Sequence, residues 1–370
     1  MIETCSGFLN EISTPFVVIE ERIVRNNLHR IHEYANRRNL SVCAHVKTHK
    51  SKTIARMQMD AGAVGIAVAK ADEAAIMAEL GDVDITVAYP AVGKARADRI
   101  ACLARTHRIR VAVDSEYVMA GLAHSAAAHG VDIGISVMFD AGLHRCGVSD
   151  PEAMVDLGRY VQKCPGLRYD GIQMYLGHLY GGSARDPAQI RQINRLWETA
   201  YEALSSAGIA PERVSSGSTP SLFNTHQLDH VTEIRVGTAV LNDYFVLKFG
   251  HCRLADCALR VVATVVSDRV PGQVLIDAGS KALSAKQLLR SERLEMGYSV
   301  EYPEARIFRL HEEHGWVDVS RCPHPPRTGD RMSIVPVNAA LCMNLYDHFY
   351  MLLETGGLRK ERVDARGCLV

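Results

Sequence analysis

The chain has 370 residues, 47% of them hydrophobic, and its 42 basic and 42 acidic side chains leave no formal net charge at pH 7. This length and composition suffice for a sizeable core and predict two domains. The charge balance favours neither nucleic acid nor a membrane surface as a partner, and without a membrane-length apolar run or a signal-peptide pattern we expect a cytoplasmic protein.

The first two thirds of the chain alternate strands with helices. Residues 14–19 predict a short leading strand, and the apolar stripe over 24–35 predicts a helix after it. Eight further strands follow, with helical segments such as 71–80 and 190–207 between most of them. These strands are residues 40–46, 65–68, 84–88, 109–113, 133–139, 170–174, 213–215 and 233–236. Because most are apolar on both faces, as parallel strands under helices are, we predict an α/β fold with a closed (β/α)8 barrel.

After Asn242 the pattern changes to strands with little helix between them. The predicted strands are residues 258–266, 272–277, 306–310, 316–319 and 331–335. We therefore predict a barrel domain over residues 16–245, followed by a β-rich domain over 246–370 that also takes residues 1–15.

Polar residues collect where the barrel strands end, which is where such barrels place their active sites. Lys47 ends the first strand, and the small residues 215–219 and 237–238 follow the last two strands. Their backbone N–H groups and hydroxyls suit a phosphate. A lysine facing a phosphate site is the arrangement that pyridoxal 5'-phosphate (PLP) requires, because the phosphate anchors the ring and the lysine amine bonds to the aldehyde.

These residues also carry a family resemblance. The segment Ala44-His45-Val46-Lys47-Thr48-His49-Lys50 resembles the Pro-His-x-Lys-Thr-His-Lys signature of the D-threonine aldolase and D-serine dehydratase-like enzymes. These are PLP enzymes of the alanine racemase class, known as fold type III. Residues 140–147, 171–178, 277–284 and 313–315 are similar to further motifs of the family, so the resemblance covers nearly the whole chain.

The resemblance implies roles for single residues. It implies that Lys47 carries PLP and that Tyr175 lies near the bond between this lysine and the cofactor. It also implies that Arg145 or Arg235 contacts the nitrogen of the PLP ring and keeps it unprotonated. The relatives' polar residues after Gly-His are replaced here by residues 179–182, so a protein donor such as His178 or Tyr180 would have to act on the substrate's β-hydroxyl in their place. The residues implied in phosphate binding are Ser216, Gly217, Ser218, Gly237 and Thr238.

The chain departs from the family at a metal site. Many relatives bind a divalent metal through a Pro-Asn-His-x-(Cys or Asp) segment, but here Asn338 and Ala340 occupy the two ligand positions. Alanine has no donor atom and a lone neutral amide is a poor ligand, so we expect no bound metal. Asp347 and His348, just downstream, are the alternative ligands.

Three functions remain open at this point. The first is a lyase that cleaves or dehydrates a D-configured β-hydroxy amino acid. The second is an amino-acid racemase or epimerase, for which Tyr175 and Cys342 are candidate bases. The third is a PLP carrier, which the β-rich segment argues against because known carriers of this fold resemble the barrel alone. The resemblance also implies a homodimer with the active site near the interface.

Overall fold

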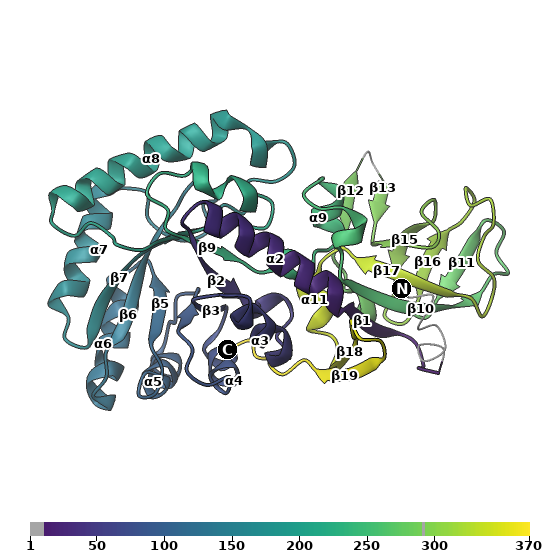
Figure 1. Ribbon diagram of the computed structural model, residues 1–370, viewed down its shortest axis with the longest axis horizontal. Helices are drawn as coiled ribbons and strands as arrows, with labels where there is room; N and C mark the ends of the chain where they lie inside the picture. The colour runs from purple at the N-terminus through teal and green to yellow at the C-terminus, as the bar shows by residue number, and fades with distance from the viewer. Residues whose placement is uncertain (1–10, 291–292) are drawn as a thin grey trace. The chain divides into compact units, whose positions relative to one another are not determined.

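The computed structural model describes residues 11–290 and 293–370, which fall into two compact units (Figure 1). The barrel unit takes residues 29–47, 54–237 and 367–370. The sheet unit takes the described residues up to 28, then 48–53 and 238–366. None of the described helices is long and apolar enough to cross a membrane.

Eight parallel strands close the barrel, as the sequence predicted. They are β2 (Ser41–His45), β3 (Gly65–Val68), β4 (Ile85–Val87), β5 (Ile109–Val113), β6 (Ile133–Phe139), β7 (Leu167–Met174), β8 (Val214–Ser216) and β9 (Glu233–Val236). The last strand returns to the first, with Val42 of β2 opposite Ile234 of β9. The intervening helices are α3 (Lys52–Asp60), α4 (Ala71–Ala78), α5 (Lys94–Leu103), α6 (Glu116–His129), α7 (Pro151–Lys163) and α8 (Pro187–Ser206).

The barrel strands are buried on both faces because helices cover their outer side. All seven residues of β6 are buried. At its end, the Phe139 ring packs against Trp197 of α8, with ring centres 5.2 Å apart. Buried side chains on both faces, apolar in most of these strands, therefore stabilise the closed parallel sheet.

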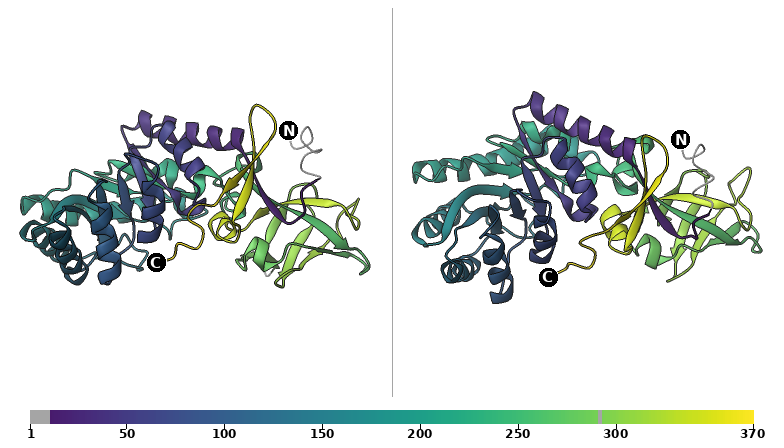
Figure 2. Two further views of the ribbon diagram at one scale, coloured as in Figure 1. Left: turned by 90° about the horizontal axis from the view of Figure 1, so that it is seen from below. Right: turned by 60° about the horizontal axis from the view of Figure 1, so that its bottom comes forward.

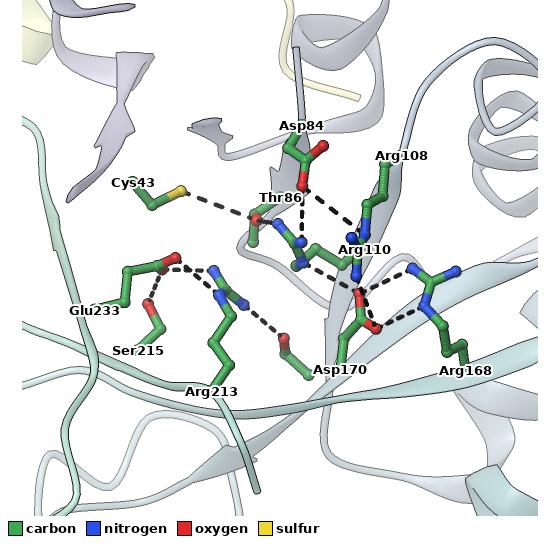
Figure 3. Close-up of polar contacts among 11 residues, drawn as sticks. Cys43, Asp84, Thr86, Arg108, Arg110, Arg168, Asp170, Arg213, Ser215 and Glu233 are labelled. Carbon is green, nitrogen blue, oxygen red and sulfur yellow. Dashed lines mark hydrogen bonds and ion pairs between the residues drawn. The ribbon is translucent and has the colours of Figure 1, made fainter. Parts of the chain in front are cut away.

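Part of the barrel is held by charged rather than apolar side chains (Figure 3). Arg110 on β5 donates from Nη2 to Asp84 at 2.9 Å and from Nε to Asp170 on β7 at 3.2 Å. Arg168 donates to the same Asp170 at 2.7 and 2.9 Å. Burial alone would raise the pKa of Asp170, but these arginines lower it, so the carboxylate stays ionised. Gly134 on β6 makes room, since a Cβ there would overlap the Asp170 carboxylate.

The sheet unit is built on nine hydrogen-bonded strands among the described residues. Their order is β15–β16–β11–β10–β1–β18–β19, with β17 on β10 and β14 on β17. The strands are β1 (Phe16–Glu20), β10 (Leu259–Ser267), β11 (Gln273–Ile276), β14 (Gly297–Ser299), β15 (Arg306–Leu310), β16 (Gly315–Asp318), β17 (Arg331–Pro336), β18 (His348–Leu352) and β19 (Leu358–Arg362). This unit also holds the pair β12 (Leu288–Arg290) and β13 (Arg293–Glu295) and the helices α9 (Tyr244–Lys248), α10 (Ser280–Leu283) and α11 (Ala339–Met343). The helix α2 (Glu21–Arg37) begins in the sheet unit and continues in the barrel unit from residue 29.

The first strand lies in the sheet unit, so the structural boundary differs from the one expected at residue 16. Val18 of β1 pairs antiparallel with Arg260 of β10 and parallel with Tyr350 of β18. In Figure 2 this purple strand near the start of the chain lies beside yellow and green strands from its C-terminal part. Residues 16–28 therefore join the β-rich part of the chain, and residues 367–370 join the barrel. The cause is that β1 takes its hydrogen bonds from strands much later in the sequence.

Candidate active site

Lys47 lies at the carboxyl end of the first barrel strand. It follows β2 inside the single-turn 3-10 helix η2 (Val46–Thr48). Its Nζ atom lies 5.8 Å from the centre of the Tyr175 ring, which follows β7. The carboxyl ends of two strands that are not neighbours in the barrel, β2 and β7, thus place an amine beside an aromatic ring.

The Lys47 amine becomes neutral more readily than an ordinary lysine. Burial, and after it the cations Arg145 and Arg235, lower the pKa of Lys47 from 10.5 to about 8, while Glu73 opposes the shift. Near neutral pH the amine is therefore unprotonated far more often than that of an ordinary lysine, although the charged form still predominates. The neutral amine is the form that attacks a carbonyl carbon.

A closed loop after β6 presents Arg145. The Asp140 N–H donates to Val148 O at 3.0 Å, and the Asp140 carboxylate accepts from the Gly142 N–H at 3.0 Å. These bonds fix the base of the loop. The Arg145 guanidinium carbon lies 4.7 Å from the centre of the Tyr175 ring, a distance that allows a cation–π contact.

Tyr175 and His178 come from the segment after β7. A Cβ at Gly177 would overlap the Tyr175 ring, so this glycine allows the ring to take its place. His178 Nδ1 is buried and has no hydrogen-bond partner among the described residues. Burial lowers the pKa of His178, and the charge of Asp140 opposes that effect. A neutral imidazole with an unused nitrogen suits a general base.

The end of β8 offers an unsatisfied hydroxyl. Ser216 Oγ is buried and has no hydrogen-bond partner in the described part of the chain. Gly217 follows with φ +117°, a backbone conformation that residues with side chains rarely adopt. The next hydroxyl is engaged, because Ser218 Oγ lies 2.8 Å from Ser221 Oγ. Of the two predicted serine hydroxyls, Ser216 is the one left for an additional group.

Arg235 lies on β9, and two hydrogen bonds hold its guanidinium. Nη1 donates to Ser215 Oγ at 2.6 Å and Nη2 donates to the Met174 carbonyl at 3.2 Å. The side chain is buried, and burial lowers its pKa. Gly237 directly follows β9 and is the last residue of this segment of the barrel unit. Thr238, the next residue, belongs to the sheet unit.

These residues fit a phosphorylated aldehyde cofactor such as PLP. Lys47 supplies an amine of lowered pKa, and Arg145 and Arg235 add positive charge around it. The buried hydroxyl of Ser216 lacks a partner, and a phosphate oxygen would provide one. Amine, cations and hydroxyl match the aldehyde and the phosphate of one molecule.

At the two positions where relatives carry metal ligands, one side chain caps a helix and the other has no donor atom. Asn338 Oδ1 accepts from the Leu341 N–H at 2.9 Å and so caps the first turn of α11. Ala340 has no donor atom, and Asp347 pairs with Arg366 at 3.0 Å. In residues 11–290 and 293–370, no three His, Cys, Asp or Glu side chains group as metal ligands would. The metal-free site stays a prediction.

Sequence reasoning missed Arg213 and Glu233, and it grouped Ser215 with the phosphate segment although its hydroxyl is engaged behind Arg235. Ser215 donates from Oγ to Glu233 at 2.6 Å, and Arg213 donates from Nε to the same carboxylate at 2.8 Å (Figure 3). The signal was present, because Arg213 with Ser215, and Glu233 with Arg235, are two residues apart on neighbouring strands and so share a face.

Comparison with known proteins gives consistent results. Residues 19–244 match the family of the alanine racemase N-terminal domain, and residues 258–352 match the putative serine dehydratase domain. The chain is 28% identical to 3-hydroxy-D-aspartate aldolase of Paracoccus denitrificans (strain Pd 1222), covering 97% of this chain and 93% of that protein. The crystal structure of D-threonine aldolase from Filomicrobium marinum superposes with a TM-score of 0.88 at 27% identity, covering 98% of both chains. D-threo-3-hydroxyaspartate dehydratase from Delftia sp. HT23 gives 0.86 at 26% identity, covering 96% of this chain and 98% of the other.

Proposed function

Because the chain belongs to the alanine racemase N-terminal domain family, we propose that it is a PLP-dependent lyase acting on a D-configured β-hydroxy α-amino acid. The two aldolases and the dehydratase it resembles are named for substrates of this class. The observation that carries the proposal is the Lys47 amine, whose pKa of about 8 suits covalent attachment of an aldehyde.

Each side chain around Lys47 has a role in holding the cofactor. Lys47 would hold PLP through its aldehyde group, and Arg145 would provide positive charge near it. Ser216, Gly217, Ser218, Gly237 and Thr238 are assigned to the phosphate, with Ser216 Oγ as the hydroxyl that gains a partner. The ring centre of Tyr175 lies 5.8 Å from Lys47 Nζ and 4.7 Å from the Arg145 guanidinium carbon, and the ring would stand beside the bond between Lys47 and the cofactor.

We assign the ring nitrogen to Arg235 rather than to Arg145. Arg235 is held on a barrel strand by two hydrogen bonds, whereas Arg145 is on a loop and lies over Tyr175. When bound, PLP delocalises the electron pair left on the substrate's α-carbon after one of its bonds breaks. Arginine only donates hydrogen bonds, so a ring nitrogen facing Arg235 accepts one and stays unprotonated.

His178 is assigned to the substrate's β-hydroxyl. Its pKa is lowered by burial, so it is a neutral acceptor at pH 7, whereas the alternative, Tyr180, is 46% exposed. When His178 takes the hydroxyl proton, the carbon–oxygen double bond of an aldehyde forms and the Cα–Cβ bond breaks. The α-carbon then needs a proton, which Lys47 would be free to supply as an ammonium once the substrate's amine had replaced it on the cofactor.

The proposed reaction proceeds without a divalent metal. What supports this is the chemistry of two residues: Asn338 uses its oxygen to cap α11, and Ala340 has nothing to coordinate with. His178 and Tyr180 are the side chains left to act on the β-hydroxyl. A chelator is therefore expected to leave turnover unchanged.

Racemisation is the alternative reaction, and it needs a base on each face of the ring. Cys342 was a candidate, but burial raises the pKa of its thiol and its Sγ donates to the Ala282 carbonyl at 3.3 Å. A protonated, hydrogen-bonded thiol does not accept an α-proton. This observation supports the lyase over the racemase.

The test combines trapping with product analysis. Borohydride reduction of the PLP-loaded protein, followed by peptide mapping, is expected to place the pyridoxyl group on Lys47. A pyridoxyl group on Lys50, the second lysine of the motif, would contradict the site; that side chain instead donates to Asn344 at 3.0 Å.

D-threonine, D-threo-3-hydroxyaspartate and D-serine are then incubated in heavy water, with their L-enantiomers as controls. Release of an aldehyde or a 2-oxo acid from a D-substrate is the expected result. Exchange of the α-proton with inversion, while the carbon skeleton stays intact, would replace the lyase with a racemase. The proposal also includes a homodimer. Light scattering of the same sample gives the molar mass, which should be that of two chains.

A further inference from the structure

A chain of four side chains runs behind the proposed cofactor site. Arg213 donates from Nε and Nη2 to the two oxygens of Glu233 at 2.8 and 2.5 Å. Ser215 donates from Oγ to Glu233 Oε1 at 2.6 Å, and Arg235 donates from Nη1 to Ser215 Oγ at 2.6 Å. All four side chains lie on or directly before the neighbouring strands β8 and β9.

The direction of each hydrogen bond in this chain is fixed. A guanidinium only donates and a carboxylate only accepts. Ser215 has a single hydroxyl hydrogen, which must point to Glu233, so a lone pair of the same oxygen must face Arg235. Ser215 therefore links a negative and a positive side chain that do not touch.

Burial makes this link strong. Ser215 is 0% exposed, Glu233 2% and Arg235 6%. In such surroundings charge-assisted hydrogen bonds are stronger than in water, and linked bonds polarise one another. The attraction of the Glu233 carboxylate thus reaches Arg235 through one oxygen atom.

We propose that Ser215 and Glu233 are positioning residues for Arg235, holding its guanidinium so that it faces the nitrogen of the cofactor ring. This inference rests on the proposed function, because the ring belongs to PLP. Ser215 acts as a spacer between the two charges. Without it, the Glu233 oxygen loses a donor and draws Arg235 into a direct ion pair, away from the ring.

Because Ser215 accepts only one hydrogen bond from Arg235, other N–H groups of this guanidinium remain available. A guanidinium has five N–H donors, and Arg235 uses one for Ser215 and one for the Met174 carbonyl. These two bonds set the plane of the group, and the remaining donors are available to an acceptor. Arg213 already pairs with both oxygens of Glu233, which keeps that carboxylate in place.

The experiment uses holoprotein loaded with PLP labelled with 15N in the ring. Solid-state NMR gives the 15N chemical shift, which separates a hydrogen-bonded pyridine nitrogen from a free or a protonated one. The variant is Ser215→Ala, with Ser215→Thr as the conservative variant that keeps the hydroxyl. Ser136→Ala is the matched control, because Ser136 is also 0% exposed on a barrel strand and accepts from Arg213 at 3.3 Å.

Ser215→Ala is expected to move the ring-nitrogen shift and to raise the Kd for PLP about tenfold, the size of one good hydrogen bond. Ser215→Thr should restore both values, and Ser136→Ala should match the wild type. A wild-type nitrogen shift in Ser215→Ala overturns the inference, as does an equal change in Ser136→Ala, which would indicate general loosening of the barrel. If the wild type carries no PLP on Lys47, the proposed function itself fails, and trapping shows that separately.

Discussion

Replacing Lys47 by methionine is expected to stabilise the PLP-free protein at pH 7. The fold lowers the pKa of Lys47 from 10.5 to about 8, so holding the charged amine there costs free energy. At about 1.4 kcal/mol per pKa unit, that lowering corresponds to roughly 3 kcal/mol of unfolding free energy. Lys47→Met removes the charge and keeps a side chain of similar length.

The advantage of Lys47→Met should disappear at high pH. Between about pH 8 and pH 10.5 the unfolded wild type holds a proton on Lys47 that the folded protein has released. The unfolded state then binds more protons, so the stability of the wild type rises with pH across this window. The gap between variant and wild type should therefore narrow from up to about 3 kcal/mol at pH 7 towards zero near pH 10.5.

Urea unfolding of the PLP-free proteins, followed by circular dichroism from pH 7 to 10.5, measures this gap. Lys94→Met is the control for exchanging a charged side chain for methionine, because the Lys94 side chain is 77% exposed. A gap between Lys47→Met and the wild type that stays constant over this range would refute the reasoning, since it would mean that Lys47 folds with its ordinary pKa.

Three further outcomes follow from the site. Ser216→Asp and Gly237→Asp each place a carboxylate beside the cofactor phosphate, so PLP titration should show at least about tenfold weaker binding; full retention of PLP by both would locate the phosphate elsewhere. Turnover should persist after dialysis against EDTA, and activity lost to EDTA but restored by manganese or zinc would reveal a rebuilt metal site. Gly177→Ala should displace the Tyr175 ring and lower kcat/KM about tenfold or more with an unchanged circular dichroism spectrum; wild-type kinetics would show that the ring position is not needed.

The barrel could be predicted because its strands carry their own signal. Runs such as 65–68 and 133–139 are mostly apolar on both faces, and helical segments separate them, so the order of elements already determines the architecture. Lys47 could be singled out as a candidate for the same reason, since the end of a barrel strand is a defined place. His178 and Ser216 followed from the family motifs and their positions.

The sheet unit was harder to predict, because its partners are far apart in sequence. The apolar run of β1 looks the same whether its neighbours are barrel strands or β10 and β18. The three-residue strands β12, β13 and β14 are too short to show a periodic pattern. The Arg213–Glu233–Ser215–Arg235 chain depends on the register between two strands, which hydrophobicity alone does not specify.

The place of β1 also determines when the protein can finish folding. As the chain leaves the ribosome, β2 to β9 are complete once residue 236 has been made. The earlier strand β1, whose five residues are all buried in the finished protein, must wait for β10 and then for β18 near the other end. Until then it is an apolar strand with both edges open, the kind of segment that aggregates or engages chaperones during synthesis.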